Sequence, residues 1–272
     1  MLLKEVAANT ALTKSKLPSA DYVVNAYTGC PHKCIYCYAE FMKKFAKHPD
    51  DEWGEFIDIK IFERIKIPKD IEGKYILISS VTDPYNPYEM EYEKTKEILE
   101  ELKGLDCCVG ILTKSKSVLR DMELFKQFKN IEVGVSMNTT DDDFRKRIEP
   151  RASSVEERLE VLKTLRKNNI KNWLALSPIF PFLTDYKKII EQTKDFVDYY
   201  CFENLNLRSE YKDRVLTLIR REYNNLHKNY KAIFLYEDQS YWSDLEQEII
   251  EYCEGNDIKY KMYFYHEKIR KK

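Results

Sequence analysis

The 272-residue sequence has few glycines, almost no net charge and no low-complexity linker. Only 7 glycines accompany 20 tyrosines and 13 phenylalanines, and no repeat longer than a strand-and-helix unit is present. The 45 lysines and arginines are balanced by 46 aspartates and glutamates, which leaves a net charge of -1. This balance gives no overall argument for a polyanionic partner, so any nucleic-acid site would have to be a local patch.

Long apolar segments are also absent. No run of 18 apolar residues could span a membrane, and the first residues, Met1–Val6, lack the apolar core of a signal peptide. The 7 cysteines are odd in number and three of them are clustered, which fits a reducing compartment better than a disulfide framework. We therefore expect a cytoplasmic protein without a membrane partner.

Three cysteines lie close together near the N-terminus. Cys30, Cys34 and Cys37 form a C-x3-C-x2-C array within the segment 28–38. Three thiolates at this spacing can hold three irons of a 4Fe-4S cluster, whose usual complement is four cysteines. One iron would then lack a protein ligand and would be open to a small molecule.

Two other chemistries fit the cysteines less well. A zinc site usually has two ligand pairs, and no second C-x2-C or H-x3-H pair is present. A redox C-x-x-C made by Cys34 and Cys37 would leave Cys30 without a role, and no clear helix follows a thioredoxin-like strand there.

Apolar segments alternate with helical patterns along most of the chain. Each apolar segment is followed by a turn signal and a stretch with helical periodicity, such as the one that starts at a capping box of Ser154 and Glu157 and ends near Asn168. This order predicts a parallel sheet with right-handed crossovers, and we expect a partial six-unit (β/α) barrel of the TIM type. The six predicted strands are 22–27, 75–80, 107–113, 131–137, 173–177 and 197–202.

The same pattern sets the expected domain limits. Residues 1–21 are predicted to be a weakly structured lead-in, residues 22–208 the barrel core, and residues 209–272 a short α/β extension packed on it. The extension contains a strand-like segment at 260–265 and ends in the basic segment 268–272, which is more typical of a solvated terminus than of a binding arm.

Polar residues follow most of the predicted strands. Because barrels of this type place function at the carboxyl ends of their strands, these residues are candidates for a common site. Simpler interpretations remain: the segment around Thr82 and Asp83 has the composition of an ordinary turn, Lys114 fits a solvated side chain, and Arg151 fits a structural ion pair beside the capping box.

The cysteine motif, with Tyr36 before its last cysteine, resembles that of radical S-adenosylmethionine (radical SAM) enzymes. Within that superfamily, Cys34–Tyr38 and the segments 79–85, 113–115, 136–139, 149–152 and 177–181 resemble the branch that includes spore photoproduct lyase and the DNA repair photolyase-like proteins. The resemblance spans roughly residues 22–185, with matching segments in the same order at successive strand ends.

The resemblance implies a 4Fe-4S cluster held by the three cysteines and a molecule of S-adenosylmethionine bound to the fourth iron. Reductive cleavage of that cofactor gives a 5′-deoxyadenosyl radical, and the electron would come from a flavodoxin or ferredoxin. The residues that would contact the cofactor are Tyr36, Thr82, Asp83, Lys114, Ser136, Asn138, Arg151 and Ile179.

One position departs from the spore photoproduct lyase pattern. Tyr38 matches a tyrosine that helps relay a hydrogen atom in that enzyme, but Ser80 stands where its hydrogen-donating cysteine is expected. A serine O–H is a far poorer hydrogen-atom donor than a thiol, so we expect a radical enzyme with another substrate. A nucleic acid or a peptide is a candidate substrate, a partner radical-enzyme protein is a candidate partner, and a non-enzymatic metal-binding or partner-binding module is the alternative.

Overall fold

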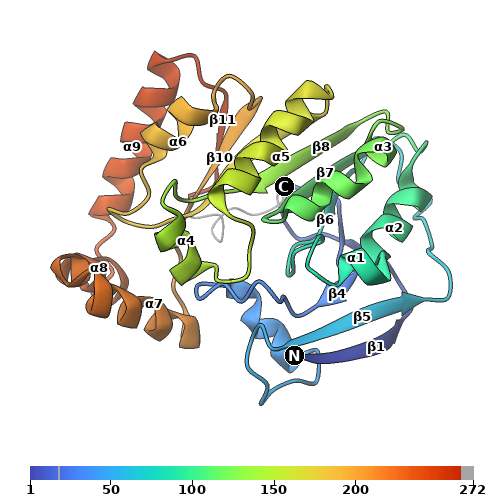
Figure 1. Cartoon of the computed structure of the whole chain (residues 1–272), viewed down its shortest axis with the longest axis horizontal. Coiled ribbons are helices and arrows are strands. Elements are labelled where there is room, and N and C mark those ends of the chain that lie inside the picture. The colour runs from blue at the N-terminus through green and yellow to red at the C-terminus, as the bar shows by residue number, and fades with distance from the viewer. Residues whose placement is uncertain (18, 265–272) are drawn as a thin grey trace.

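The computed structural model describes residues 1–17 and 19–264 and shows a mixed α/β fold with two sheets. In Figure 1 the helices α9, α6, α5, α3 and α2 lie along one side of the larger sheet, while β1 and β5 form a separate small sheet at the lower right. The predicted basic segment 268–272 lies outside the described residues.

The larger sheet has eight strands in the order β11-β10-β9-β8-β7-β6-β3-β2. All neighbours from β3 to β11 are parallel, and only β2 runs antiparallel to β3. The six predicted barrel strands are therefore confirmed in chain order, as an open, partial barrel. The strands are β2 (Leu12–Lys14), β3 (Tyr22–Val24), β6 (Tyr75–Ile78), β7 (Cys108–Thr113), β8 (Ile131–Ser136), β9 (Lys171–Ile179), β10 (Tyr199–Asn204) and β11 (Tyr260–Met262).

Helices follow most of these strands and cover one face of the sheet. None of the helices in the described part of the chain is long and apolar enough to cross a membrane. The helices are η1 (Tyr38–Lys44), α1 (Glu89–Tyr92), α2 (Lys94–Leu102), η2 (Lys116–Asp121), α3 (Met122–Phe125), α4 (Asp142–Ile148), α5 (Val155–Lys167), α6 (Tyr186–Thr193), α7 (Ser209–Glu222), η3 (Asn224–Leu226), α8 (His227–Phe234) and α9 (Ser240–Gly255).

Buried apolar side chains at every second position of the strands build the main core. Side chains such as Ile76, Ile111 and Leu174 are fully buried and belong to one apolar cluster with residues of the covering helices, including Leu99 and Leu162. Successive residues of a strand point to opposite faces, so the intervening residues line the concave face of the barrel. The helix-covered face therefore supplies most of the hydrophobic stabilisation.

On the concave face, two aromatic side chains pack against glycines of the neighbouring strands. A Cβ atom on Gly134 of β8 would lie 2.1 Å from Cε2 of Trp173 on β9. A Cβ on Gly110 of β7 would lie 1.9 Å from the hydroxyl of Tyr75 on β6. These contacts leave no room for larger residues, so the two glycines let the aromatic rings pack directly on the sheet.

The N-terminal region differs from the prediction. The segment expected to be weakly structured contains β2 and also β1 (Leu2–Ala8), which pairs in parallel with β5 (Phe56–Phe62) from Leu2 opposite Phe56 to Ala8 opposite Phe62. The short strand β4 (Tyr27–Thr28) pairs with the other edge of β5. The pairing is between segments far apart in the chain, and local composition carries no signal of it.

One helical segment of the chain is interrupted. The pattern from Glu89 to Leu102 is divided between α1 and α2 at Glu93, which has a left-handed φ of 48°. The capping box is confirmed, because the Ser154 side chain accepts from the Glu157 N–H and the Glu157 side chain accepts from the Ser154 N–H. In the C-terminal region, β11 adds a parallel strand to β10, so the extension joins the barrel sheet.

The contact between Gly134 and Trp173 can be tested by substitution. Gly134→Ala should lower the free energy of unfolding by about 1–3 kcal/mol, the usual cost of overpacking. Gly255→Ala is the matched control, because a Cβ there meets no atom within 4 Å. Urea unfolding followed by circular dichroism measures both; equal midpoints for the two variants would contradict the packing argument.

Candidate functional site

The cysteine loop follows β4 and turns sharply at Gly29. Gly29 has φ of 89°, and a Cβ atom there would lie 2.4 Å from the carbonyl oxygen of Phe56. Both the left-handed backbone and the close approach require glycine. The turn brings Cys30 and Cys34 into buried positions, while Cys37 is partly buried.

Residues at the strand ends hold the loop in place. The Thr82 hydroxyl donates to the Gly29 carbonyl at 2.6 Å, and the Ile35 N–H donates to the Ile148 carbonyl at 3.0 Å. The Arg151 N–H donates to the His32 carbonyl at 3.3 Å. The loop is thus fixed by contacts with two separate parts of the barrel, the segment after β6 and the end of α4, as expected for a preformed binding site.

Burial raises the pKa of all three thiols. The pKa of Cys30 is raised to about 12, and those of Cys34 and Cys37 are also raised, in each case chiefly by burial. The neighbouring sulfurs contribute to the shifts of Cys30 and Cys34, so the three groups lie within electrostatic reach of one another. Without a metal the thiols are neutral at pH 7, and a metal that binds thiolates must displace their protons.

The described residues contain no group of three or more His, Cys, Asp or Glu side chains arranged to hold a single metal ion. An iron–sulfur cluster places a different demand on its ligands, because each cysteine binds a different iron. The ligands of a cluster therefore surround a cube rather than converge on one point.

Asp83, after β6, is engaged by the protein itself. Its carboxylate accepts from the Thr113 hydroxyl at 2.6 Å, the Lys114 N–H at 2.7 Å and the Tyr85 N–H at 2.9 Å. Burial opposes ionisation, but His32, Thr113 and the Lys114 N–H outweigh it and lower the pKa of Asp83 to about 2. Asp83 therefore fixes the end of β7 and with it the position of Lys114.

The side chain of Lys114 points to the cysteine loop. Its Nζ lies 6.0 Å from the centroid of the Tyr36 ring and makes no hydrogen bond or ion pair with any described residue. Burial lowers its pKa, but Glu149 and Cys34 outweigh that effect, so the net shift is upward. Lys114 is thus a cation beside the loop with bonding capacity left for an anionic ligand.

A buried carboxylate connects the loop to the barrel. Glu149 is fully buried and accepts hydrogen bonds from the Tyr36 hydroxyl and the Arg158 guanidinium. Burial opposes its ionisation, but Arg158 and Lys114 outweigh it and lower its pKa. Asn138, at the end of β8, lies 3.5 Å from both the Tyr36 hydroxyl and a Glu149 oxygen.

Unpaired polar atoms gather around the same loop. Five buried side-chain atoms in the described residues lack a hydrogen-bond partner. Three of them are at the site: Nε1 of Trp53, Oδ1 of Asn138 and Nδ1 of His32, of which the last lies 3.4 Å from the Asp83 carboxylate. An unpaired buried polar atom costs about 1–3 kcal/mol, so such a concentration fits a site built to receive a polar group. Together with three thiols in one loop, the donor set fits a cluster and a polar cofactor.

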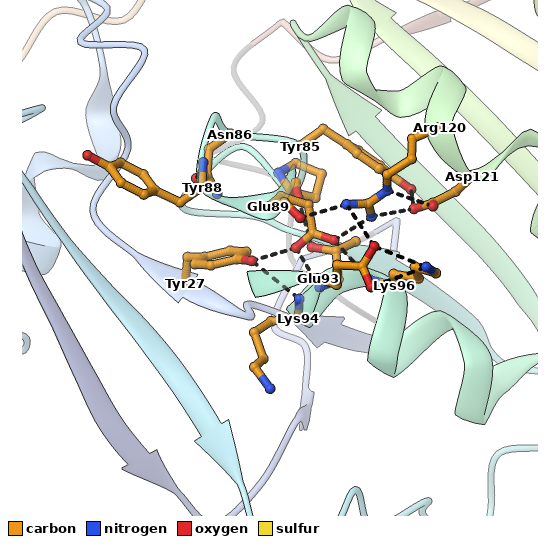
Figure 2. A network of polar contacts seen from close by, with 12 residues as sticks. Tyr27, Tyr85, Asn86, Tyr88, Glu89, Glu93, Lys94, Lys96, Arg120 and Asp121 are labelled. Atoms are coloured by element: carbon orange, nitrogen blue, oxygen red, sulfur yellow. Dashed lines mark hydrogen bonds and ion pairs between the residues drawn. The ribbon is translucent and has the colours of Figure 1, made fainter. Parts of the chain in front are cut away.

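A second network stabilises the loop from behind (Figure 2). Glu89 accepts from the Tyr27 hydroxyl, from the Arg120 guanidinium at 2.7 Å and from two N–H groups at the start of α2. Arg120 also pairs with Asp121, which accepts from the Tyr85 hydroxyl at 2.9 Å. The network joins β4, the loop after β6, the start of α2 and η2 through buried polar contacts.

The other predicted cofactor residues lie at the same ends of the strands but differ in how they are used. The Ser136 hydroxyl donates to the Ser177 carbonyl at 3.1 Å, and Ile179 is buried at the end of β9. Tyr36 is buried with its ring 5.4 Å from that of Phe180. Arg151 donates to Oε1 of Glu55 at 2.7 Å and to the Gly54 carbonyl at 3.1 Å, so its guanidinium is held in the structural ion pair.

Tyr38 and Ser80 meet at the open side of the site. The Tyr38 hydroxyl donates to the backbone carbonyl of Ser80, and the Tyr38 side chain is exposed. The Ser80 hydroxyl accepts from the Asn25 amide at 3.3 Å. The contact confirms no role for Tyr38, but it shows that residues 38 and 80 are neighbours.

Four contributors were not singled out from the sequence. Glu149 and Arg158 form the buried pair, but only Arg151 of the 149–152 segment was predicted as a contact, and nothing in the amphipathic pattern of α5 marks Arg158. Trp53 and His32 each have a buried ring nitrogen without a hydrogen bond. His32 lies inside the cysteine motif, 3.4 Å from Asp83, which is the one available sequence signal.

The Glu149–Arg158 pair should be important for stability. Glu149→Gln leaves the buried Arg158 charge uncompensated and should lower the free energy of unfolding by about 3–5 kcal/mol. Glu123→Gln is the control, because it breaks the exposed Glu123–Lys126 pair, for which the expected loss is below about 1 kcal/mol. Urea denaturation of both variants provides the comparison, and similar losses would refute the assignment.

Two uncharacterised proteins are similar to this chain in sequence. The chain is 43% identical over 208 residues to an uncharacterised protein of Methanocaldococcus jannaschii, covering 75% of this chain and 78% of that one. It is 34% identical over 176 residues to an uncharacterised protein of Acidianus two-tailed virus, covering 60% of this chain and 57% of the viral protein.

Solved structures share the fold. Spore photoproduct lyase complexed with dinucleoside spore photoproduct superposes with a TM-score of 0.57 at 16% identity, over 82% of this chain and 76% of the lyase. SuiB of Streptococcus suis bound to S-adenosylmethionine gives a TM-score of 0.51 at 14% identity, over 89% of this chain and 49% of SuiB. The sequence model of the radical SAM superfamily matches residues 24–197, which include the cysteine loop and the strand ends around it, and the chain belongs to that superfamily.

Proposed function

We propose that the protein is an enzyme that binds a 4Fe-4S cluster through Cys30, Cys34 and Cys37 and cleaves S-adenosylmethionine reductively. The bound cluster and cofactor would supply a 5′-deoxyadenosyl radical, which abstracts a hydrogen atom from a substrate that is not yet identified. A flavodoxin- or ferredoxin-type protein would supply the electron. One observation carries the proposal: three thiols, two of them buried and one partly buried, share a loop with unpaired polar atoms at the carboxyl ends of the strands.

The residues of the chain would have separate tasks. Lys114 is a cation with free bonding capacity beside the loop, and it suits the carboxylate of the cofactor. Asn138 has an unpaired amide oxygen and suits a hydroxyl or amine donor. Thr82, Asp83 and Ser136 have hydrogen bonds to the protein and would form polar surroundings of the cofactor, whereas Tyr36 and Ile179 would form apolar ones.

Arg151 has a supporting role in this proposal. Its guanidinium neutralises Glu55, and that pair lowers the pKa of Glu55 to about 2 through the Lys33 and Arg151 hydrogen bonds. Its N–H holds the His32 carbonyl within the cysteine motif. Arg151 would therefore position the loop rather than bind the cofactor directly.

The substrate is proposed to differ from that of spore photoproduct lyase. Tyr38 is present near Ser80, but a serine hydroxyl cannot replace a thiol as a hydrogen-atom donor. The proposal is therefore limited to formation of the radical and abstraction of hydrogen, with a nucleic acid or a peptide as the candidate substrate classes.

The cluster and its chemistry can be tested together. After anaerobic reconstitution with iron and sulfide, the protein should contain about four irons per chain and absorb visible light. Addition of dithionite and S-adenosylmethionine should then release 5′-deoxyadenosine, measured by liquid chromatography with mass detection. A fully loaded protein that forms no 5′-deoxyadenosine would refute the proposed reaction, and a colourless protein with one zinc would refute the cluster.

Single cysteine variants give the matched controls for this experiment. Cys30→Ala, Cys34→Ala and Cys37→Ala should each lose iron and all 5′-deoxyadenosine formation. Cys253→Ala removes a buried thiol of α9, outside the loop, and should retain both. Equal losses in all four variants would indicate general destabilisation instead of cluster ligation.

The role of Lys114 can be measured by cofactor affinity. A charge-assisted hydrogen bond contributes about 1.5–3 kcal/mol, so Lys114→Met should weaken cofactor binding by about 10- to 100-fold. Lys116→Met is the control, because Lys116 is paired with Glu160. Equilibrium dialysis of S-adenosylmethionine against the reconstituted variants, with iron content checked, gives the result; unchanged affinity in Lys114→Met would exclude the contact.

A further inference from the structure

Trp53 lies against the cysteine loop in an otherwise apolar group. It is 3% exposed and packs in one cluster with Cys30, Ala39 and Phe56, to which Cys37 also contributes. Its ring meets that of Phe56 edge to face, with centroids 5.7 Å apart. The indole is therefore held firmly at the side of the loop that carries the first and last cysteines.

The backbone beside Trp53 is shaped to allow this approach. Gly54 has φ of 91°, and a Cβ atom there would lie 2.6 Å from Cβ of Lys33, inside the cysteine motif. Lys33 in turn donates to Glu55 at 2.7 Å, which ties the segment 53–55 to the loop. The position of Trp53 relative to the cysteines is thus set by a steric requirement and by an ion pair.

The Trp53 N–H has no acceptor suited to it in the described residues. Of the three tryptophans in the sequence, it alone has a buried indole nitrogen without a hydrogen bond. Cys37 packs against the same cluster as Trp53, so the indole lies beside the Cys37 side chain. Burial raises the pKa of the Cys37 thiol, and Trp53 is one of the neighbours that lower it in part. A neutral thiol is a weak acceptor, whereas a thiolate bound to iron carries charge and accepts readily.

We propose that the Trp53 indole N–H donates a hydrogen bond to the Cys37 thiolate of the bound cluster and raises the reduction potential of that cluster. Reduction adds negative charge, and hydrogen bonds to the sulfurs of an iron–sulfur cluster stabilise the more negative state. The remaining neighbours of Trp53 in this group are apolar and offer no such donor. Trp53 is a positioning and tuning residue, and the inference rests on the proposed function only in requiring the cluster.

The experiment compares three proteins reconstituted anaerobically: the wild type, Trp53→Phe and Trp242→Phe. Trp53→Phe keeps an aromatic ring but removes the N–H, and Trp242→Phe makes the same change in α9. Electron paramagnetic resonance during a potentiometric titration gives the midpoint potential of each cluster. We expect a more negative midpoint for Trp53→Phe and equal midpoints for the wild type and Trp242→Phe; equal midpoints for all three fully loaded proteins would overturn the inference.

A second measurement does not depend on a variant retaining its cluster. In wild-type protein labelled with ¹⁵N at the indole nitrogen only, pulsed electron paramagnetic resonance of the reduced cluster should show a nitrogen coupling. An absence of coupling in a fully reduced sample would overturn the inference. A coupled, loaded wild type that releases no 5′-deoxyadenosine would instead refute the proposed reaction and leave the role of Trp53 intact.

The stability of the metal-free proteins distinguishes an effect of Trp53 on the reduction potential of the cluster from a purely structural role in packing. In the apo state the Trp53 N–H has no partner to lose, so Trp53→Phe should unfold at about the same urea concentration as Trp242→Phe. A lower midpoint potential without a specific loss of apo stability supports the hydrogen bond. A large loss of apo stability in Trp53→Phe, with an unchanged potential, would assign Trp53 a structural role only.

Discussion

The buried carboxylate of Glu149 is the interaction on which the cysteine loop depends. It accepts from Tyr36 of the loop and from Arg158 of the capped helix α5, while the Lys114 charge lies close by. Burial alone would make Glu149 neutral, so its ionised state requires these neighbours, and each of them is held in turn by the carboxylate. The cysteine loop is thereby joined to the end of β7 and to Glu149 and Arg158, which come more than a hundred residues later in the chain.

Around this carboxylate the polar atoms divide into two groups. Those of Thr82, Asp83 and Arg151 are bonded within the protein and hold the loop and the end of β7. Oδ1 of Asn138 and Nε1 of Trp53 are buried and have no hydrogen bond, at an expected cost of about 1–3 kcal/mol each. A folded chain can bear such a cost locally when the core is large, and the fully buried strand residues and their covering helices form such a core. The division explains how motif residues of similar composition can have different tasks, some structural and some directed to a ligand.

Much of the architecture followed from local pattern, because parallel strands that are buried on both faces are near-continuous apolar runs and the helices that follow them have clear start signals. Ser154 and Glu157 are an example, since both halves of the capping box are present. Long-range pairing carried no such signal: β1 finds its partner in β5, and Glu93 divides a helix by adopting a left-handed backbone. The motif singled out the cysteine loop as a candidate site, but the partners of Asp83 and Arg151 depend on side chains that only folding brings together.

The contact between Tyr38 and Ser80 can form without the thiol side chain that a hydrogen-atom transfer would need. Tyr38 donates to the backbone carbonyl of residue 80, and the N–H of that residue donates to Asn25 at 2.9 Å. Both bonds involve the main chain, so they do not require a particular side chain at position 80. A cysteine or a serine there leaves Tyr38 in the same place, whereas only the cysteine offers a hydrogen atom that a carbon radical abstracts easily. The fold can therefore retain Tyr38 whether or not a hydrogen-atom donor stands at position 80.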